Sequence, residues 1–251
     1  MPGGVVGKQP SRSKLEMCGR YALYGPASRI REQFDLDGEF DFTPRHNIAP
    51  TTPALIVCPG SDGSRVGLLC RWGLIPRWAR DVNTGTTLIN ARGETVAEKP
   101  AFRTAFRRGR CLVPANGFYE WKAVQEGGRL IKQPYYVRAP DERNLFAFAG
   151  LSERWVSAAG DEIHSCCIIT TAANALMAPI HDRMPVIVGA NDYAAWLDPS
   201  NTDADGLRAL LRPAESGDMI AYPVSRAVNS SRSDSPTFVQ PAWTRTCGPG
   251  S

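Results

Sequence analysis

The sequence predicts an α+β fold: a single domain with a largely antiparallel, barrel-like β-sheet core and a few peripheral helices. Apolar runs of strand length follow one another along the middle of the chain, whereas stretches with helical periodicity are few. The 251 residues also include 23 glycines and 20 prolines, a content that suits a fold with many tight turns.

Most of the predicted elements are strands bounded by Gly, Pro or Ser. The expected strands are 54–58, 65–72, 110–115, 117–124, 134–139, 144–151 and 164–171. The turn sequence QEGGR at 125–129 predicts a hairpin between its two neighbours. The expected helices are 28–35, 100–109 and 191–197, and Pro100 suits the first turn of the second of these.

The two ends of the chain differ from its middle in composition. Residues 1–16 are rich in Gly, Pro, Ser and Lys without apolar periodicity, so we expect a disordered N-terminal extension. Residues 242–251 have the composition of a flexible C-terminal tail. A single domain is therefore expected over residues 17–241.

Charge and cysteine content narrow the classes of protein. The net charge is only +4, from 29 basic and 25 acidic residues, which does not by itself indicate nucleic-acid binding. Seven cysteines, an odd number, follow no secretory signal, and no apolar run of about 20 residues exists, so a reducing cytoplasm is expected. No phosphate loop, dinucleotide fingerprint or zinc-spaced cysteine quartet occurs, and we expect neither cofactor nor metal.

Five segments combine aromatic, Gly or Pro residues with polar groups that do not suit a simple core strand. They are MCGRYAL (17–23), RWGLIPRW (71–78), INARGET (89–95), CLVPANGFYEW (111–121) and PIHDRMPVI (179–187). Together with NIAPT (47–51) and YPVSRAVN (222–229), they closely resemble the SRAP family, the SOS response-associated peptidases, also called abasic-site processing proteins. The resemblance runs from Met17 to about Pro241.

The resemblance implies that Cys18 becomes the mature N-terminus and the covalent nucleophile. An N-terminal cysteine has a thiol and a free α-amine on adjacent carbons, and the amine has a reference pKa of about 8. The amine attacks the aldehyde of an opened abasic deoxyribose to give an imine. The thiol then closes a five-membered thiazolidine, which removes the imine and protects the strand from β-elimination. An internal cysteine has only an amide nitrogen and cannot react in this way.

Three further catalytic residues follow from the same resemblance. Glu120 lies in a segment that looks mostly buried, where a carboxyl group tends to have a raised pKa and can transfer protons beside the amine. Asn90 corresponds to an asparagine that holds the opened sugar. His181 corresponds to a histidine that assists sugar opening or reversal of the link. Taken alone, each type of residue is more often structural, and only the joint resemblance favours the catalytic interpretation.

The expected DNA-binding residues lie close to these positions in the sequence. Arginine suits phosphates because its guanidinium forms paired hydrogen bonds, and exposed aromatic rings stack on bases. The candidates are Arg20, Trp72, Trp78, Arg92, Arg103 and Arg183. For Trp72 a place in the core is an equal alternative, and the arginines of 102–110 suit a solvated helix face equally well.

One departure from the family pattern is that 16 residues precede Met17. Either translation starts at Met17, or the extension is removed by proteolysis, or the full chain is inactive. The leading hypothesis is a DNA-damage protein of the SOS and repair responses with possible lyase or protease side activity, cytoplasmic and at the nucleoid when bound to DNA. Its expected partner is single-stranded DNA with abasic sites, and it is expected to be a monomer that contacts no membrane and meets replication or repair proteins. The alternatives are a thiol peptidase using Cys18 and His181, and a non-covalent single-strand binding module.

Overall fold

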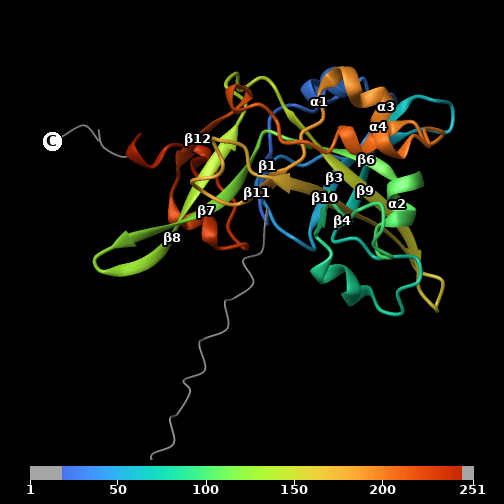
Figure 1. The fold of residues 1–251 in the computed structure, drawn as a ribbon, viewed down its shortest axis with the longest axis horizontal. Coiled ribbons are helices and arrows are strands. Elements are labelled where there is room, and N and C mark those ends of the chain that lie inside the picture. The colour runs from blue at the N-terminus through green and yellow to red at the C-terminus, as the bar shows by residue number, and fades with distance from the viewer. Residues whose placement is uncertain (1–18, 245–251) are drawn as a thin grey trace, which may run out of the picture.

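The computed structural model describes residues 19–244, which form two β-sheets with short helices around them (Figure 1). The predicted α+β class with a barrel-like, largely antiparallel core is confirmed. The strands are β1 (Tyr21–Leu23), β2 (Arg45–Ile48), β3 (Pro53–Pro59), β4 (Arg65–Trp72), β5 (Asn90–Arg92), β6 (Arg110–Ala115), β7 (Gly117–Glu126), β8 (Arg129–Arg138), β9 (Phe146–Val156), β10 (Glu162–Ala172), β11 (Arg183–Pro185) and β12 (Ile220–Pro223). The α-helices are α1 (Ala27–Phe34), α2 (Arg103–Arg108), α3 (Tyr193–Leu197) and α4 (Ala204–Ala209).

Five strands close into a barrel. The order is β10-β4-β3-β6-β9, and β9 pairs back to β10, so the ring has no free edge among these strands. All pairs are antiparallel except β4 with β10. The short strands β5 and β11 also pair with β10, toward its C-terminal end. The barrel therefore displays residues of β5 and β11 at one end of a single central strand.

The second sheet has the order β12-β8-β7-β1-β2. Its longest pairing is the β7–β8 hairpin, which projects beyond the rest of the molecule (Figure 1). The turn uses Gly127 and Gly128, both with positive φ, which confirms the predicted hairpin. Strand β1 lies between β2 and β7 and pairs with both of them in antiparallel fashion.

Aromatic side chains join the two sheets into one core. Phe118 of β7 contacts Phe146 and Phe148 of β9 at ring-centroid distances of 6.4 and 5.9 Å. Tyr21 of β1 packs edge-on against Phe148 and Trp72. Because these rings come from both sheets, β1 and β7 keep a fixed place relative to the barrel.

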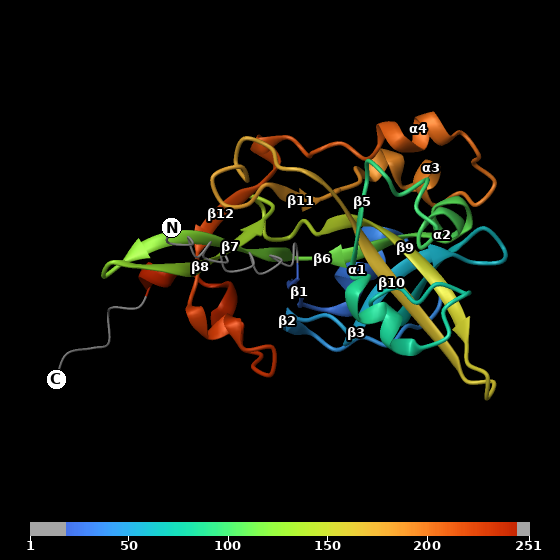
Figure 2. The ribbon, with the colours of Figure 1, turned by 60° about the horizontal axis from the view of Figure 1, so that its bottom comes forward.

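The helices gather at one end of the barrel, where Figure 2 shows α2, α3 and α4 close together. Trp196 of α3 contacts Phe106 of α2 and donates its Nε1–H to the carbonyl of Cys111 in β6 at 2.8 Å. Phe34 of α1 stacks on Tyr193 of α3 at 5.5 Å. These short helices depend on such contacts, since isolated helices of their length are unstable in water.

Two predicted helices begin later in the structure than the sequence predicts. The helix predicted over 100–109 begins at Arg103, because residues 93–102 form successive turns closed by bonds such as Glu98 N to the Thr95 carbonyl. The helix predicted over 191–197 begins with a 3₁₀ turn and is α-helical from Tyr193. At the C-terminal end of the described residues, 242–244 form another 3₁₀ turn, and Trp243 contacts Tyr222. The extension 1–16 and residues 245–251 lie outside the described part.

Candidate functional site

The beginning of the described chain lies beside Glu120. Tyr119 N donates to the Arg20 carbonyl at 3.0 Å, and Tyr21 pairs with Phe118. Continued by one residue, this antiparallel register places Gly19 opposite Glu120. The Glu120 residue is only 1% exposed. A buried acid is thus placed next to the residue that follows Cys18, and Cys18 itself lies outside the described residues.

The Arg20 guanidinium is partly committed to the protein. It donates from Nη1 to Asn47 Oδ1 and to the Val228 carbonyl, both at 2.9 Å, and from Nη2 to the Asn229 carbonyl at 3.2 Å. Burial lowers its pKa, yet a guanidinium keeps its charge at neutral pH. Arg20 therefore ties β1 to the segment 228–229 and retains unused N–H groups, since a guanidinium has five.

Asn47 also hydrogen-bonds to this part of the chain. Its fully buried amide donates from Nδ2 to the carbonyls of Ser230 and Ser233 at 3.0 and 2.8 Å while its Oδ1 accepts from Arg20. Trp121 Nε1 donates to Asn229 Oδ1 at 2.7 Å. Sequence reasoning quoted the NIAPT and YPVSRAVN motifs without assigning these asparagines a role. The two motifs are joined by the bond from Asn47 Nδ2 to the Val228 carbonyl at 3.3 Å.

A second group of candidate residues meets around β10. Ile168 of β10 pairs with Asn90, Thr170 pairs with Arg92, and Ala172 pairs with Arg183. The INARGET and PIHDRMP segments therefore become neighbours although about 90 residues separate them in the sequence. Asn90 is half-buried and Arg92 is exposed.

His181 precedes β11 and its imidazole is 8% exposed. Its Nδ1 accepts the Arg183 backbone N–H at 3.1 Å and also faces Asp182 Oδ1 at 3.0 Å. The first contact requires an unprotonated Nδ1, and the second favours a protonated one. Nδ1 thus lies between a backbone donor and a carboxylate acceptor.

Arg183 forms a two-pronged ion pair with Glu94 instead of presenting its charge freely. Nη1 and Nη2 lie 2.5 and 2.9 Å from the two Glu94 carboxylate oxygens, and Nη2 also donates to the Thr170 carbonyl at 2.7 Å. The hydrogen bonds from Arg183 hold the pKa of the Glu94 carboxyl below its usual range. The expected phosphate contact of Arg183 thus competes with a carboxylate that is half exposed.

Trp72 connects the two groups of residues from inside the core. The Trp72 residue is 1% exposed, its ring contacts Tyr21 at 5.3 Å, and its Nε1–H donates to the Ile89 carbonyl at 2.9 Å. A base cannot stack on a ring without an exposed face, so the expectation that Trp72 contacts DNA is wrong. The structure instead places Trp72 between β1 and the residue that precedes Asn90.

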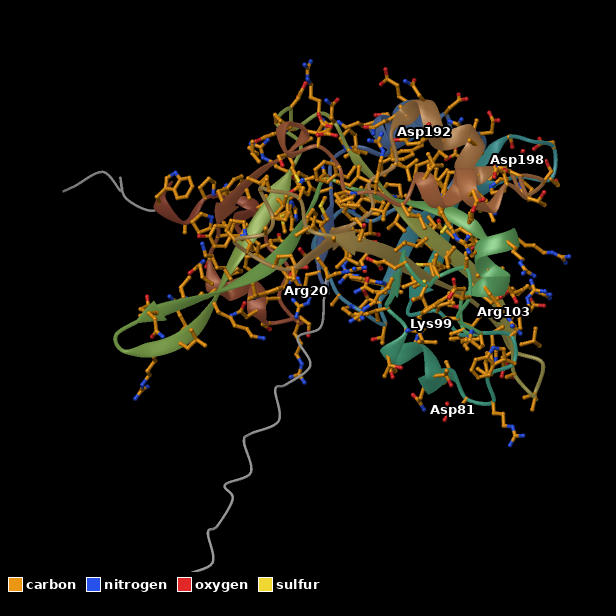
Figure 3. The ribbon with its side chains drawn as sticks, viewed as in Figure 1. Arg20, Asp81, Lys99, Arg103, Asp192 and Asp198 are labelled. Carbon is orange, nitrogen blue, oxygen red and sulfur yellow. The ribbon has the colours of Figure 1, made fainter. Side chains whose placement is uncertain are left out.

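Trp78 and Arg103 lie on the surface, and Trp78 is 63% exposed. Trp78 Nε1 donates to the Pro100 carbonyl at 3.4 Å, next to Lys99. Figure 3 shows basic Arg20, Lys99 and Arg103 across the lower part of the view and acidic Asp192 and Asp198 on the helical side above. Its contact with Pro100 brings the exposed tryptophan close to the backbone that follows Lys99.

The described part of the chain holds no cluster of metal-binding side chains. Residues 19–244 contain no group of three or more His, Cys, Asp or Glu side chains that could hold a metal ion. No helix among them is long and apolar enough to cross a membrane. The two groups therefore offer a buried carboxylate beside β1, and a buried imidazole, an amide and two arginines around β10.

The fold places this protein in a class of α+β proteins in which a closed five-stranded barrel is joined to a second sheet. Residues 17–231 match the family model described as SOS response associated peptidase (SRAP), and the chain belongs to this family. The match begins at Met17, the residue before Cys18.

Similar proteins include several named for abasic-site processing. The chain is 44% identical over 227 residues to the abasic site processing protein YoqW of Bacillus subtilis, covering 89% of this chain and 99% of the relative. It is 31% identical to the abasic site processing protein HMCES of Gallus gallus, covering 90% of this chain and 78% of that protein. A crystal structure of a Bacteroides thetaiotaomicron protein has a TM-score of 0.77 at 30% identity and covers 90% of this chain and 100% of that one.

Proposed function

We propose that this protein binds single-stranded DNA and captures abasic sites through a covalent bond to Cys18. The observation that supports it most directly is the pairing of β1 with β7, which places buried Glu120 opposite Gly19. Cys18 directly precedes Gly19 in the sequence, and Glu120 is therefore the acid–base group that we assign to its α-amine. The named relatives, which process abasic sites, support the same substrate.

The reaction balances with the loss of one water. The α-amine of Cys18 adds to the aldehyde carbon of the opened sugar, and the resulting carbinolamine expels its hydroxyl as water to give an imine. The thiol sulfur then adds to the imine carbon, and its proton is taken up at nitrogen. The product is a thiazolidine, and no oxidant or cofactor is needed. The reactive form must begin at Cys18, because an amide nitrogen cannot form the imine.

Glu120 is the proposed proton-transfer group for the amine. It takes a proton from the attacking amine and returns one to the departing hydroxyl, which a carboxyl group can do in both directions. Its burial keeps bulk water from competing for these protons. Asn90 offers an amide donor and acceptor to the sugar hydroxyls, at the start of β5.

His181 is the proposed acid for the sugar oxygen, and its substitution gives a testable result. We expect His181→Ala to slow the capture of closed sugars and also to slow reversal of the finished link, by about 10²-fold or more. Both directions share the step in which the ring oxygen gains or loses a proton. Single-turnover capture and release measured on the same DNA would show this, and a change confined to DNA affinity would contradict it.

DNA binding is proposed to involve Arg92, Trp78 and Arg103 on the surface, with the unused N–H groups of Arg20 facing phosphate. Exposed Arg92 follows Asn90 by two residues, so a phosphate beside the captured sugar lies within its reach. Stacking of a base on Trp78 contributes about 1–3 kcal/mol without sequence preference. Arg183 contributes positive charge that Glu94 partly neutralises.

The ion pair makes a prediction about salt dependence. We expect Arg92→Ala to weaken binding of single-stranded DNA and to flatten its salt dependence by about one counterion. Glu94→Gln should do the opposite, because Arg183 then keeps its charge without a carboxylate partner. Fluorescence anisotropy of a labelled oligonucleotide over a salt series measures both effects.

The pH dependence of the Glu94 effect has a defined sign. Arg183 holds the pKa of Glu94 below its usual range, so the carboxylate stays charged as pH falls through the ordinary glutamate range. The difference between wild type and Glu94→Gln should therefore persist there and fade only in more acidic solution. Tighter binding of wild type than of Glu94→Gln at neutral pH would show that the pair organises the site instead of shielding it.

One experiment separates this function from its rivals. The protein, with its chain beginning at Cys18, is incubated with single-stranded DNA containing one abasic site and analysed on a denaturing gel. We expect a heat-stable shift that intact DNA does not give. A non-covalent binding module would give no shift on the denaturing gel, and a thiol peptidase would cleave a peptide substrate without cross-linking DNA. Either result would overturn the proposal.

A further inference from the structure

A buried carboxylate in the barrel has a partner in a surface loop. Glu153 lies on β9 with its side chain 6% exposed, and its Oε1 accepts from Arg77 Nε at 2.5 Å. The Arg77 side chain is 69% exposed and belongs to the loop between β4 and the 3₁₀ helix at Val82–Thr87. A buried carboxylate is costly unless it is paired, so the ion pair with Arg77 favours the observed conformation of the loop.

The loop is attached to the β9–β10 hairpin at three alternate residues. Ile75 N donates to Ser165 Oγ at 2.9 Å, Arg77 pairs with Glu153, and the Ala79 carbonyl accepts Trp155 Nε1 at 2.7 Å. Glu153 and Trp155 share one face of β9, because successive side chains of a strand point to opposite sides. Ser165 of β10 is the Cα partner of Glu153, so these contacts form one continuous platform.

An apolar cluster and a close backbone contact complete the attachment. Ile75, Ala79 and Trp155 form a small buried cluster apart from the main core, with Val82 and Ile163 packed against it. At the start of the loop, Gly73 has a φ of +130°, and a side chain there would collide with the carbonyl oxygen of Gly85. Trp78 lies between the attached residues Arg77 and Ala79, and its ring is not part of this cluster: it is 63% exposed and donates to the Pro100 carbonyl at 3.4 Å.

We propose that Glu153 is a positioning residue for DNA binding, which acts through Arg77 to hold the loop that presents Trp78 to a base. The inference rests on the proposed function, because it concerns the DNA surface of the same site. Without the ion pair the loop samples more open conformations, and the apparent affinity falls with the fraction of molecules in the binding conformation. The chemistry at Cys18, Glu120 and His181 is untouched once DNA is bound.

Glu153→Gln tests the proposal, with Glu162→Gln as its matched control. Glu162 lies on β10 in an exposed pair with Arg154, so both substitutions remove one negative charge from the β9–β10 hairpin and break one ion pair with an arginine. We expect Glu153→Gln to raise the half-saturating DNA concentration roughly three- to tenfold relative to Glu162→Gln. The maximal cross-linking rate should be unchanged. Equal behaviour of the two variants, or a lowered maximal rate, would overturn the proposal.

The Trp78→Ala background shows whether the effect passes through the tryptophan. We expect Glu153→Gln to have no further effect on DNA affinity there, since residues that act as one unit are not additive. The same loss of affinity in both backgrounds would contradict a role through Trp78. If wild-type protein failed to bind DNA at all, the proposed function itself would fail.

Limited trypsin digestion tests the loop without DNA and so separates these two failures. In Glu153→Gln, cleavage after Arg77 and Arg80 should become faster while the rest of the chain stays resistant, as located by mass spectrometry. Glu153→Asp, which keeps the charge, should restore part of the resistance and part of the affinity. Cleavage at unchanged rates in the loop would show that Glu153 does not hold it, whatever the outcome with DNA.

Discussion

Replacing Cys18 with serine is expected to abolish the heat-stable cross-link to abasic DNA. A hydroxyl is a far weaker nucleophile than a thiol toward the imine carbon, so the ring does not close to a stable product. The α-amine remains, and an imine therefore still forms transiently. Because the imine acidifies the neighbouring sugar proton, we expect Cys18→Ser to show some strand cleavage in place of stable capture.

The control for this prediction is a cysteine elsewhere on the protein. Cys58 on β3 is partly accessible, but burial raises the pKa of its thiol, and no free amine accompanies it. Cys58→Ser should cross-link as wild type does. Denaturing gels with single-turnover sampling measure adduct and cleaved strand together. Stable adduct formed by Cys18→Ser at the wild-type rate would exclude the thiazolidine mechanism.

Replacing Glu120 with glutamine is expected to slow cross-linking by about 10²–10⁴-fold, the usual contribution of a general acid–base group. Glutamine has nearly the same shape and keeps hydrogen bonding, yet it cannot exchange a proton. DNA affinity should stay the same, because Glu120 is buried beside β1 and is not part of the basic surface. Rates measured between about pH 5 and pH 9, beside binding at equal salt, test both statements.

Glu126→Gln is the matched control for Glu120. Glu126 lies at the exposed far end of β7, and its carboxylate pairs with Arg226, which follows β12 in the chain. The Glu126→Gln substitution removes one carboxylate from β7 at the end that does not pair with β1, so cross-linking should keep its wild-type rate. Equal slowing in both variants would indicate that β7 has lost its structure, and an unaffected Glu120→Gln would show that Cys18 reacts without this acid.

The parts of the fold that sequence predicted are those with a strong local pattern. The apolar runs at 65–72 and 110–115 became β4 and β6 with the same bounds, and β6 is buried along its whole length, as a continuous apolar run predicts. Gly127 and Gly128 marked the hairpin turn through their backbone freedom. The three-residue strands β1, β5 and β11 were missed, since pairing with distant strands and not local periodicity makes them strands.

In the candidate site, too, the sequence predicted which residues matter but not the contacts that they make. The resemblance supplied Asn90, Glu120 and His181, but neither the motifs nor their spacing indicated which charges are already paired. The Arg183–Glu94 and Arg77–Glu153 pairs depend on how strands far apart in sequence are aligned. Trp72 was ambiguous because a tryptophan followed by a glycine suits both a core and a binding loop, and only its burial decides between them.

The central claim is that the reactive group is the free amine and thiol of Cys18, and the mass of the intact cross-linked species tests it most directly. The purified adduct is digested to leave one abasic nucleotide on the protein and is measured by mass spectrometry. The account predicts a chain that begins at Cys18, with a mass equal to protein plus abasic fragment minus one water, and with the modification on the N-terminal peptide. A cross-linked chain that still contains residues 1–17 would contradict it.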